Sequence, residues 1–204
     1  MSLLRRVFSG KNMAMPRIVI LISGQGSNMR AILSKIRQRK LAAECVLVLS
    51  DREATGLALA RTFGVKAELF AKHKDESREA FDTRLAARIH KENPALVVCA
   101  GYLKIITRPL LTAFPRRILN IHPSLLPAFP GLKAQQQALD YGVKITGCTI
   151  HLVDEGVDTG RILAQSPVAV KKGDSVAALS RRILAAEHDL YWRTIAGYLK
   201  TLKV

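Results

Sequence analysis

Short, almost entirely apolar runs alternate with helical patterns along this chain. Arg17–Ile22 reads Arg-Ile-Val-Ile-Leu-Ile, and Ala95–Ala100 reads Ala-Leu-Val-Val-Cys-Ala. A strand that is apolar on both faces is typical of the centre of a parallel sheet. Parallel neighbours need a crossover, which is usually a helix. The alternation therefore predicts an α/β fold: a single-domain, Rossmann-like, mainly parallel sheet with helices on both faces.

Periodicity, glycines and prolines mark the other elements. Helices are expected after the first strand and over residues 54–63, 78–92, 108–114, 134–141 and from Val176 onward, and further strands over 44–50, 66–70, 118–122, 144–153 and 161–170. An acidic glycine loop joins the last two strands, which predicts an antiparallel C-terminal strand pair. We expect one domain over residues 16–204. Residues 1–15 are interpreted as an N-terminal extension, either disordered or a non-native start.

The composition limits the class of protein. Hydrophobic residues make up 49% of the 204 residues. No apolar run approaches the roughly 20 residues that span a bilayer, so we expect no membrane partner. Cys45, Cys99 and Cys148 lie in apolar runs without CxxC spacing. This indicates buried free thiols in a reducing compartment, the cytoplasm, rather than disulfides or a metal site.

The formal net charge is +16, and the basic residues are spread over the whole chain. The one dense run, Arg37–Lys40, lies at an expected helix end, where cations complement the helix dipole. Aromatic residues make up only 5%, too few to suggest stacking platforms for single strands. We interpret the charge as an attraction for small anionic substrates and expect no nucleic-acid partner. A basic nucleic-acid-binding α/β module remains an alternative of a different class.

A glycine loop, Ser23-Gly24-Gln25-Gly26-Ser27-Asn28, joins the first strand to a helical pattern. Ser27 or Asn28 is expected to cap this helix. Free backbone N–H groups at a helix start bind anions, usually phosphate. A dinucleotide fingerprint requires a third glycine where this chain has Met29, which disfavours NAD. A tight turn without a ligand is the other interpretation.

Asn120 and His122 fall on one face of the strand over 118–122, which Pro123 ends. An amide can donate to a developing oxyanion, and an imidazole can donate or move a proton. Simple capping of the strand end is the alternative. In α/β sheets ligands bind beyond the carboxyl ends of strands. The glycine loop, the segment Gly101–Lys104 and His122 all lie at such ends, so three loops are expected to converge on one edge.

Glu187 lies on or beside the apolar stripe of the last helix. The inward residues expected there are Val176, Leu179, Ile183, Leu190 and Ile195. A buried carboxylate needs a partner or a ligand. The alternative is a glutamate at the edge of the stripe that reaches solvent.

Together these segments resemble the phosphoribosylglycinamide formyltransferase family, also called glycinamide ribonucleotide transformylase. The matching segments are Ser23–Asn28, Ser77–Phe81, Asn120–Pro127, Pro130–Leu132, the loop ending at Asp158, and Glu187-His188. The motif Asn-x-His-Pro-Ser-Leu-Leu-Pro with a later Asp is specific to folate-dependent formyltransferases and hydrolases. The Gly-Ser-Asn loop narrows the resemblance to the glycinamide enzyme.

The resemblance implies formyl transfer from 10-formyltetrahydrofolate, the co-substrate, to the amine of glycinamide ribonucleotide in de novo purine synthesis, by a monomer or homodimer. It implies catalytic roles for Asn120, His122 and Asp158, with Asp158 favouring the cationic form of His122. It implies ribonucleotide contacts from Gly26, Ser27, Asn28 and Glu187. It implies a formyl-folate site made by Arg78, Leu103, Lys104, Ile105, Ile106, Asn120, Asp154, Glu155, Gly156, Val157 and Asp158. No metal is implied.

Two departures from the family pattern concern the expected site. Where the family commonly has His-x-His after Pro-Gly-Leu, this chain has Lys133-Ala134-Gln135. This leaves the three catalytic residues intact but changes the groups that organise nearby water. Lys104 stands where arginine is also found, which keeps the charge and alters the hydrogen-bond geometry.

Sister enzymes with the same Asn-x-His and Asp groups are the nearest alternatives. One hydrolyses formyltetrahydrofolate and carries a regulatory N-terminal domain, and another formylates methionyl-tRNA and carries a further C-terminal domain. Neither extra domain is expected in this sequence.

Overall fold

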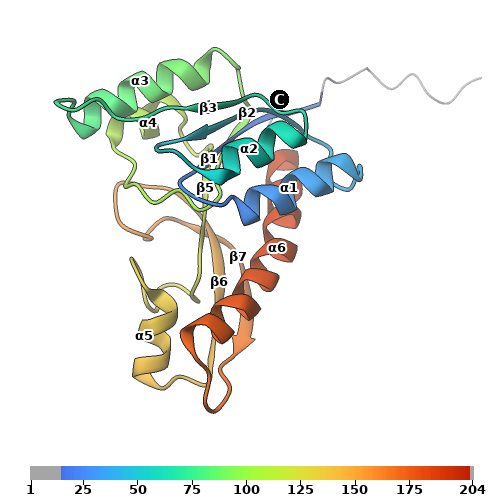
Figure 1. Ribbon diagram of the computed structural model, residues 1–204, viewed down its shortest axis with the longest axis vertical. Coiled ribbons are helices and arrows are strands. Elements are labelled where there is room, and N and C mark those ends of the chain that lie inside the picture. Colours follow the sequence, from blue (N-terminus) through green and yellow to red (C-terminus); the bar gives the residue numbers. More distant parts are fainter. Residues whose placement is uncertain (1–14, 203–204) are drawn as a thin grey trace, which may run out of the picture.

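The computed structural model describes residues 15–202, which form one seven-stranded sheet in the order β3-β2-β1-β4-β5-β6-β7. The five strands from β3 to β5 are parallel. β6 is antiparallel to β5, and β7 is antiparallel to β6. Figure 1 shows the parallel part with its helices at the top and the long β6–β7 pair descending beside α6. The predicted fold class, including the antiparallel C-terminal pair, is confirmed.

The helices and strands lie within one or two residues of their predicted positions. In chain order they are β1 Arg17–Ile22, α1 Ser27–Arg37, β2 Glu44–Ser50, α2 Thr55–Thr62, β3 Ala67–Leu69, α3 Arg78–His90, β4 Leu96–Cys99, α4 Arg108–Ala113, β5 Ile118–His122, α5 Ala134–Tyr141, β6 Ile145–Leu152, β7 Ile162–Ala169 and α6 Val176–Thr201. The expected extension over residues 1–15 lies, except for Met15, outside the described residues.

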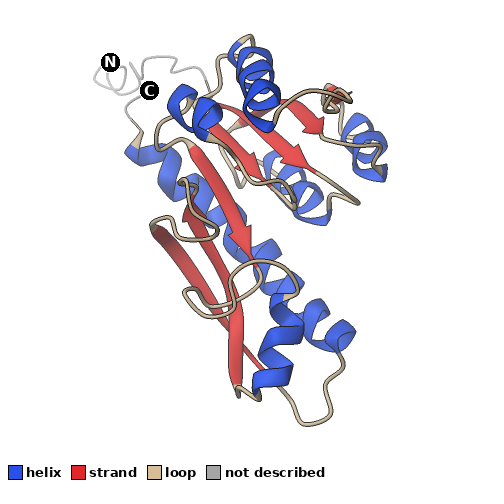
Figure 2. Ribbon diagram, turned by 90° about the vertical axis from the view of Figure 1, so that its left-hand side faces the viewer, coloured by secondary structure: helices blue, strands red, loops and turns tan. Residues whose placement is uncertain are grey.

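Helices cover both faces of the parallel part, as Figure 2 shows. Side chains alternate along a strand, so β1 contributes to two cores. Ile18, Ile20 and Ile22 pack against α1, α2 and α6, whereas Val19 and Leu21 pack against α3 and α4. All five are fully buried. This explains why the β1 sequence lacks a polar face.

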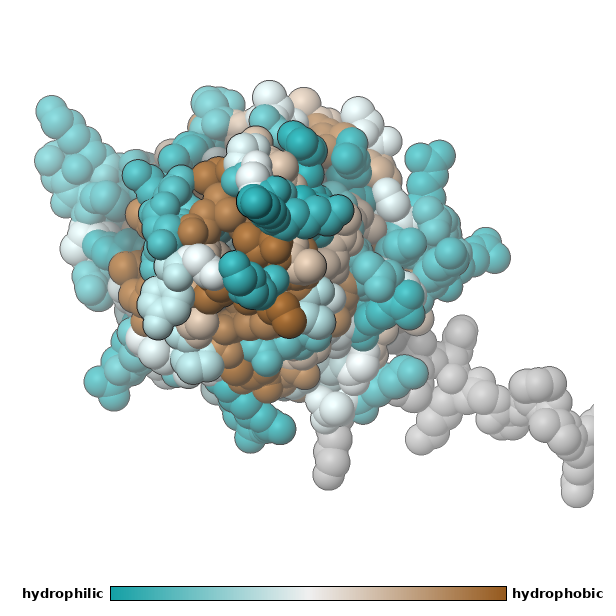
Figure 3. Space-filling model, turned by 90° about the horizontal axis from the view of Figure 1, so that it is seen from below, coloured by the Kyte–Doolittle hydropathy of each residue, from teal (hydrophilic) through white to brown (hydrophobic). Residues whose placement is uncertain are grey.

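The lower end of the molecule is built from β6, β7, α5 and α6. A smaller core joins Cys148 to Leu179 and Ile183 of α6. Several large apolar side chains of this region remain exposed, among them Leu132 (78% exposed) and Tyr141 (80%). Viewed from this end in Figure 3, apolar surface lies between hydrophilic side chains.

Three local expectations can be compared with the structure. The α1 cap prediction is wrong: Gly26, in a left-handed conformation at φ 72°, occupies the N-cap position, and neither Ser27 nor Asn28 does so. For α6 the sequence offers Asp174 or Ser175 as the cap, and Ser175 takes this position: its Oγ accepts a hydrogen bond from the Ala178 N–H. Val176 is 38% exposed and does not belong to the buried stripe, because it lies in the first turn beyond the sheet.

Cys45, Cys99 and Cys148 are free and buried, as expected. Among residues 15–202, no helix is long and apolar enough to cross a membrane.

Candidate active site

A cavity of about 600 Å³ opens at the carboxyl edge of the sheet, beyond β4 and β5. It lies beside the place where the strand order turns from β1 to β4, the expected ligand position in such sheets. Twelve of the predicted site residues line it: Asn28, Leu103, Lys104, Ile105, Ile106, Asn120, His122, Asp154, Gly156, Val157, Asp158 and Glu187.

Asn120 and His122 reach this cavity from the C-terminal part of β5. Residues two apart share one face of a strand, and both side chains line the cavity as predicted. His122 is buried, with 4% of its surface exposed. Pro123 follows and ends the strand.

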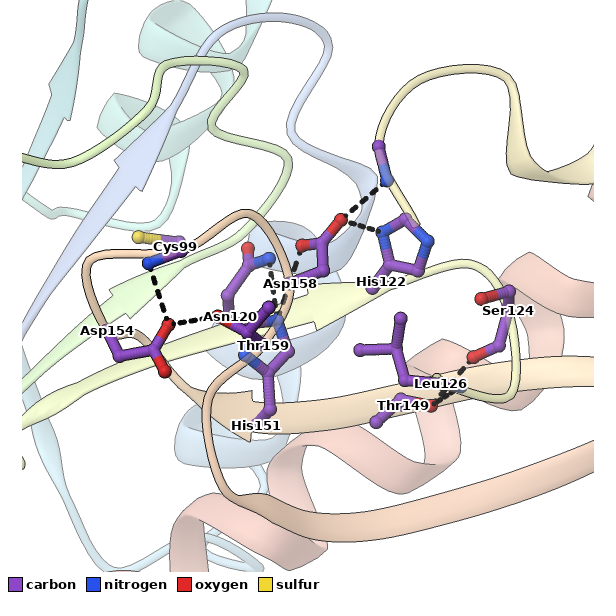
Figure 4. A network of polar contacts seen from close by, with 12 residues as sticks. Cys99, Asn120, His122, Ser124, Leu126, Thr149, His151, Asp154, Asp158 and Thr159 are labelled. Carbon is purple, nitrogen blue, oxygen red and sulfur yellow. Dashed lines mark hydrogen bonds and ion pairs between the residues drawn. The ribbon is translucent and has the colours of Figure 1, made fainter. Parts of the chain in front are cut away.

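Asp158 connects the loop after β6 to this strand. Its Oδ2 lies 3.1 Å from His122 Nδ1 and accepts a 2.8 Å hydrogen bond from the Gly131 N–H (Figure 4). Burial alone would raise the pKa of the carboxyl. The contacts with His151 and Gly131 and the charge of His122 outweigh burial, and they hold the Asp158 pKa below its ordinary value. Asp158 is therefore an anion at neutral pH.

The second ring nitrogen of His122 is also engaged. Nε2 lies 2.8 Å from the carbonyl oxygen of Phe129. Both partners of the ring, a carboxylate and a carbonyl, are acceptors, so both nitrogens donate only in the imidazolium form. Phe129 has φ 55°, an uncommon conformation for a residue other than glycine. The carboxylate and the carbonyl thus hold the imidazole ring from both of its nitrogens.

His151 is a member of this cluster that the sequence prediction missed. It is the cross-strand partner of Asn120, and its Nε2 lies 3.2 Å from Asn120 Nδ2 and 3.5 Å from Asp158 Oδ1. Its Nδ1 donates to the Leu152 carbonyl, and its Nε2 faces both the Asn120 amide and the Asp158 carboxylate. The sequence feature that could have indicated this role was a histidine within the strand expected over 144–153, which is otherwise without ionisable side chains except Cys148 and its first residue, Lys144.

Asn28 and Glu187, from the first turn of α1 and the middle of α6, meet in the wall of the cavity. Asn28 Nδ2 donates a 2.7 Å hydrogen bond to Glu187 Oε2, and both residues are about 6% exposed. Burial raises the pKa of Glu187 to about 6, although the Asn28 bond acts against this shift. Oδ1 of Asn28 has no partner among the described residues. The expectation of a buried, partnered Glu187 is confirmed.

The glycine loop is held against α2. The Gly56 N–H donates to the Gly24 carbonyl at 3.2 Å, and a Cβ on Gly56 would lie 2.7 Å from that oxygen. Gly26 and Ser27 do not line the cavity. The loop therefore approaches the site with its backbone, and only Asn28 of the three predicted residues contributes to the cavity wall.

Two residues predicted for the folate site lie outside this cavity. Arg78, at the start of α3, contacts the backbone of the 101–106 segment: its Nε donates to the Ile105 carbonyl at 2.8 Å. Glu155 points away at the tip of its loop and comes within 4.0 Å of Arg108. Glu155 is flanked in the sequence by residues that line the cavity, and Arg78 contacts the 101–106 segment. Neither side chain lines the cavity itself.

The loop after β6 is ordered by its own first residue. Asp154 Oδ1 accepts from the Thr159 hydroxyl at 2.8 Å and from the Gly156 N–H at 3.2 Å. These bonds close the loop so that Asp158 points back to β5. Figure 4 shows Asp158 directed toward His122, and Asp154 bonded within its own loop.

Lys133 and Gln135, where the family has histidines, both line the cavity. Lys133 occupies the N-cap position of α5 with φ 59°. The departure therefore lies in the site itself. Among residues 15–202, no group of three or more His, Cys, Asp and Glu side chains could hold a metal ion.

An amide, an imidazole and a carboxylate at one cavity of a Rossmann-like sheet define a site for acyl-group chemistry. The formyl transferase family model matches residues 16–195. The chain therefore belongs to the formyl transferase family.

Curated relatives narrow this membership. The phosphoribosylglycinamide formyltransferase of Mycobacterium tuberculosis is 42% identical over 181 residues, covering 89% of this chain and 84% of the relative. The Bacillus subtilis protein of the same name is 36% identical over 178 residues, covering 87% and 91%. A bovine trifunctional purine biosynthetic protein is 40% identical over 176 residues, covering 86% of this chain. The chain spans only 17% of the length of this trifunctional relative.

Solved structures agree with this assignment. A glycinamide ribonucleotide transformylase from Symbiobacterium toebii is 49% identical, with a TM-score of 0.91, and the match covers 95% of this chain and 94% of that one. The resemblance on which the sequence interpretation rests is confirmed.

Proposed function

We propose that this protein transfers the formyl group of 10-formyltetrahydrofolate to the amine of glycinamide ribonucleotide, in purine synthesis. The observation that carries the proposal is the cluster of Asn120, His122 and Asp158 at one cavity. The matches to phosphoribosylglycinamide formyltransferases support the same reaction.

In this reaction the substrate amine attacks the formyl carbon, and negative charge grows on the formyl oxygen. Asn120 keeps one Nδ2 hydrogen on His151 and offers the other to the cavity. His122 can donate to the same oxygen once its Nε2 releases the Phe129 carbonyl. One such donor typically contributes about 3–4 kcal/mol to the transition state.

Asp158 serves two purposes in the proposed mechanism. Its charge stabilises the imidazolium form of His122 at 3.1 Å. As an anion at neutral pH it can also accept a proton, through a water molecule, from the attacking amine and pass it toward the leaving folate nitrogen. The reaction needs no covalent intermediate.

The two substrates are assigned to different ends of the cavity. Glu187 and Asn28 are placed to contact the ribonucleotide, with the backbone of Gly26 and Ser27 toward its phosphate. The segment Leu103–Ile106 and the loop over 154–158 are assigned to the folate. A cavity of about 600 Å³ that combines apolar side chains with hydrogen-bonding ones is suited to a folate ring.

Further parts of the proposal concern the protein as a whole. Residues 16–204 act as one formyltransferase domain, as a monomer or homodimer. Three free buried thiols support a reducing compartment, and we assign the protein to the cytoplasm. Nucleic acid is not a partner in this proposal.

One assay tests the reaction. The protein is mixed with 10-formyltetrahydrofolate, with and without glycinamide ribonucleotide, and deformylated folate is followed optically. The proposal expects turnover only when the ribonucleotide is present. Turnover without it would instead indicate a formyltetrahydrofolate hydrolase. No turnover combined with steeply salt-dependent binding to random duplex DNA would favour the nucleic-acid-binding module.

A further inference from the structure

The segment over 123–130 folds back over the end of β5, the strand that carries His122. The Phe129 carbonyl of this segment lies 2.8 Å from His122 Nε2. Three of its eight residues are prolines, which have no N–H to donate, so its backbone can make few hydrogen bonds of its own. The position of the Phe129 carbonyl therefore depends on groups outside the segment.

A row of three directly opposed residues crosses β5, β6 and β7 at this point. His122 is the cross-strand partner of Thr149 on β6, and Thr149 is the partner of Gln165 on β7. Directly opposed residues of antiparallel strands lie on the same face of the sheet. Thr149 and Gln165 therefore face the same side as His122 and reach the segment that folds over it.

The Thr149 side chain is fully buried, and its hydroxyl uses all of its hydrogen-bonding capacity. The hydroxyl donates to the Ser124 carbonyl at 2.7 Å and accepts from the Leu126 N–H at 3.0 Å (Figure 4). It also accepts from Gln165 Nε2 at 3.0 Å. A hydroxyl has one donor and two acceptor sites, so none remains free.

Gln165 and Ser124 extend this network toward Phe129. Gln165 Nε2 donates to the Leu126 carbonyl at 2.8 Å, so both backbone polar groups of Leu126 are bound by side chains of the row. The Ser124 hydroxyl donates to the carbonyl of Ala128. The network thus ends one residue before the carbonyl that holds the imidazole.

We propose that Thr149 and Gln165 are positioning residues for His122, because they hold the segment that places the Phe129 carbonyl against Nε2. This inference rests on the proposed function, in which the same Nε2 donates to the formyl oxygen. Neither Thr149 nor Gln165 lines the cavity, so they act on the reaction through His122 and not on a substrate. Their loss should lower kcat while KM for both substrates stays unchanged.

The first test compares Thr149→Val with Thr149→Ser. Valine keeps the shape of the side chain but leaves the Leu126 N–H and the Ser124 carbonyl without their partner. It should lower kcat by about 10- to 100-fold, because a displacement of about 1 Å near the reacting groups can cost a factor of about 10². Serine keeps the hydroxyl and should restore most of the rate. A raised KM with unchanged kcat in the valine variant would overturn the proposal.

Thr146→Val is the matched control. Thr146 lies on the same strand and is only 1% exposed, but its hydroxyl has no hydrogen-bond partner among residues 15–202. The same substitution removes no hydrogen bond there, so kcat should not change. Equal losses of kcat in Thr146→Val and Thr149→Val would indicate a general effect of packing in β6 and overturn the proposal.

Gln165→Leu tests the same network from the edge of the sheet. Gln165 is exposed on β7, so this variant remains informative even if Thr149→Val does not fold. It removes the bonds to the Leu126 carbonyl and to the Thr149 hydroxyl, and kcat should fall by about threefold to tenfold. An unchanged kcat in this variant would contradict the positioning role.

NMR signals of the His122 ring provide a measurement that does not depend on turnover. They should shift in Thr149→Val and Gln165→Leu and stay unchanged in Thr146→Val. Unchanged His122 signals in the first two variants would overturn the positioning role even if kcat fell. Absence of ribonucleotide-dependent turnover in the unmodified protein would instead overturn the proposed function, and normal turnover of Thr149→Val would overturn the positioning role alone.

Discussion

Nδ1 of His122 lies 3.1 Å from Oδ2 of Asp158, although one residue ends β5 and the other lies in the loop after β6. The carboxylate is held from its other side by the Gly131 N–H at 2.8 Å. Three separate segments thus meet at one carboxylate. The pairing fixes the orientation of the imidazole, and the predictions on catalysis depend on it.

Asp158→Asn should lower kcat for formyl transfer by about 10²- to 10⁴-fold, the usual contribution of a positioned acid or base. The amide keeps the size of the side chain but can neither balance the imidazolium nor accept a proton at neutral pH. KM for the ribonucleotide should change little, because the contacts assigned to that substrate are made by Glu187 and Asn28, which do not bond to Asp158. Steady-state kinetics with a thermal melt as folding control would check this, and a kcat within a few-fold of the unmodified protein would contradict it.

His151→Phe should reduce kcat by about tenfold, the value of one hydrogen bond of roughly 1–1.5 kcal/mol. The phenyl ring fills the same space but no longer accepts from Asn120. His151 positions Asn120, so KM for both substrates should stay constant. His151→Gln, whose side-chain oxygen can accept the same bond, should restore much of the rate. Equal losses in both variants would instead indicate a packing role.

The buried Glu187 carboxyl should make stability depend on pH. Its pKa is about 6 in the folded protein, above the ordinary 4.5. The unfolded chain therefore loses this proton first as pH rises, and the group's contribution to the free energy of unfolding decreases between about pH 4.5 and 6. The expected loss is about 2 kcal/mol from pH 4 to pH 7.

The measurement compares urea unfolding of the protein with that of Glu187→Gln at several pH values. Glutamine can keep the hydrogen bond from Asn28 but does not titrate, so the difference between the two curves isolates Glu187. The unmodified protein should lose stability relative to the variant as pH rises. A constant difference across this pH range would contradict the assigned burial.

Gly56→Ala should distort the glycine loop. The added Cβ would lie 2.7 Å from the Gly24 carbonyl oxygen and 2.6 Å from Cδ1 of Ile22. Such overpacking costs roughly 1–3 kcal/mol, and it should also raise KM for the ribonucleotide because Asn28 is displaced. Gly24→Ala is the matched control, since no atom lies within 4 Å of its added Cβ. Similar effects of the two substitutions on stability and KM would argue against this packing constraint.

Most of the sheet could be predicted from the sequence because its strands are buried on both faces. Such strands leave continuous apolar runs, and Arg17–Ile22 and Glu44–Ser50 were predicted to the residue. The predicted cap of α1 was wrong because capping depends on backbone conformation. Gly26 adopts a left-handed φ of 72°, and no sequence pattern distinguishes this from a Ser27 cap.

Some site residues could be placed from the sequence and others could not, because only some of them depend on a single strand. Asn120 and His122 lie on one strand, so their spacing alone places them on one face. His151 was missed because its role comes from the antiparallel register of β6 against β5. Arg78 was assigned to the folate cavity by resemblance, but its guanidinium instead bonds behind the 101–106 segment.

By itself the sequence determined the elements, their alternation and the identity of the reactive groups, because these depend on local periodicity and on motifs within one segment. Only the tertiary structure decided which groups meet. The bond between Asn28 and Glu187, the pairing of His122 with Asp158, and the ion pair of Lys104 with Asp51 each join segments distant in the chain. Such contacts follow from strand order and register, which bring the carboxyl ends of several strands to one edge.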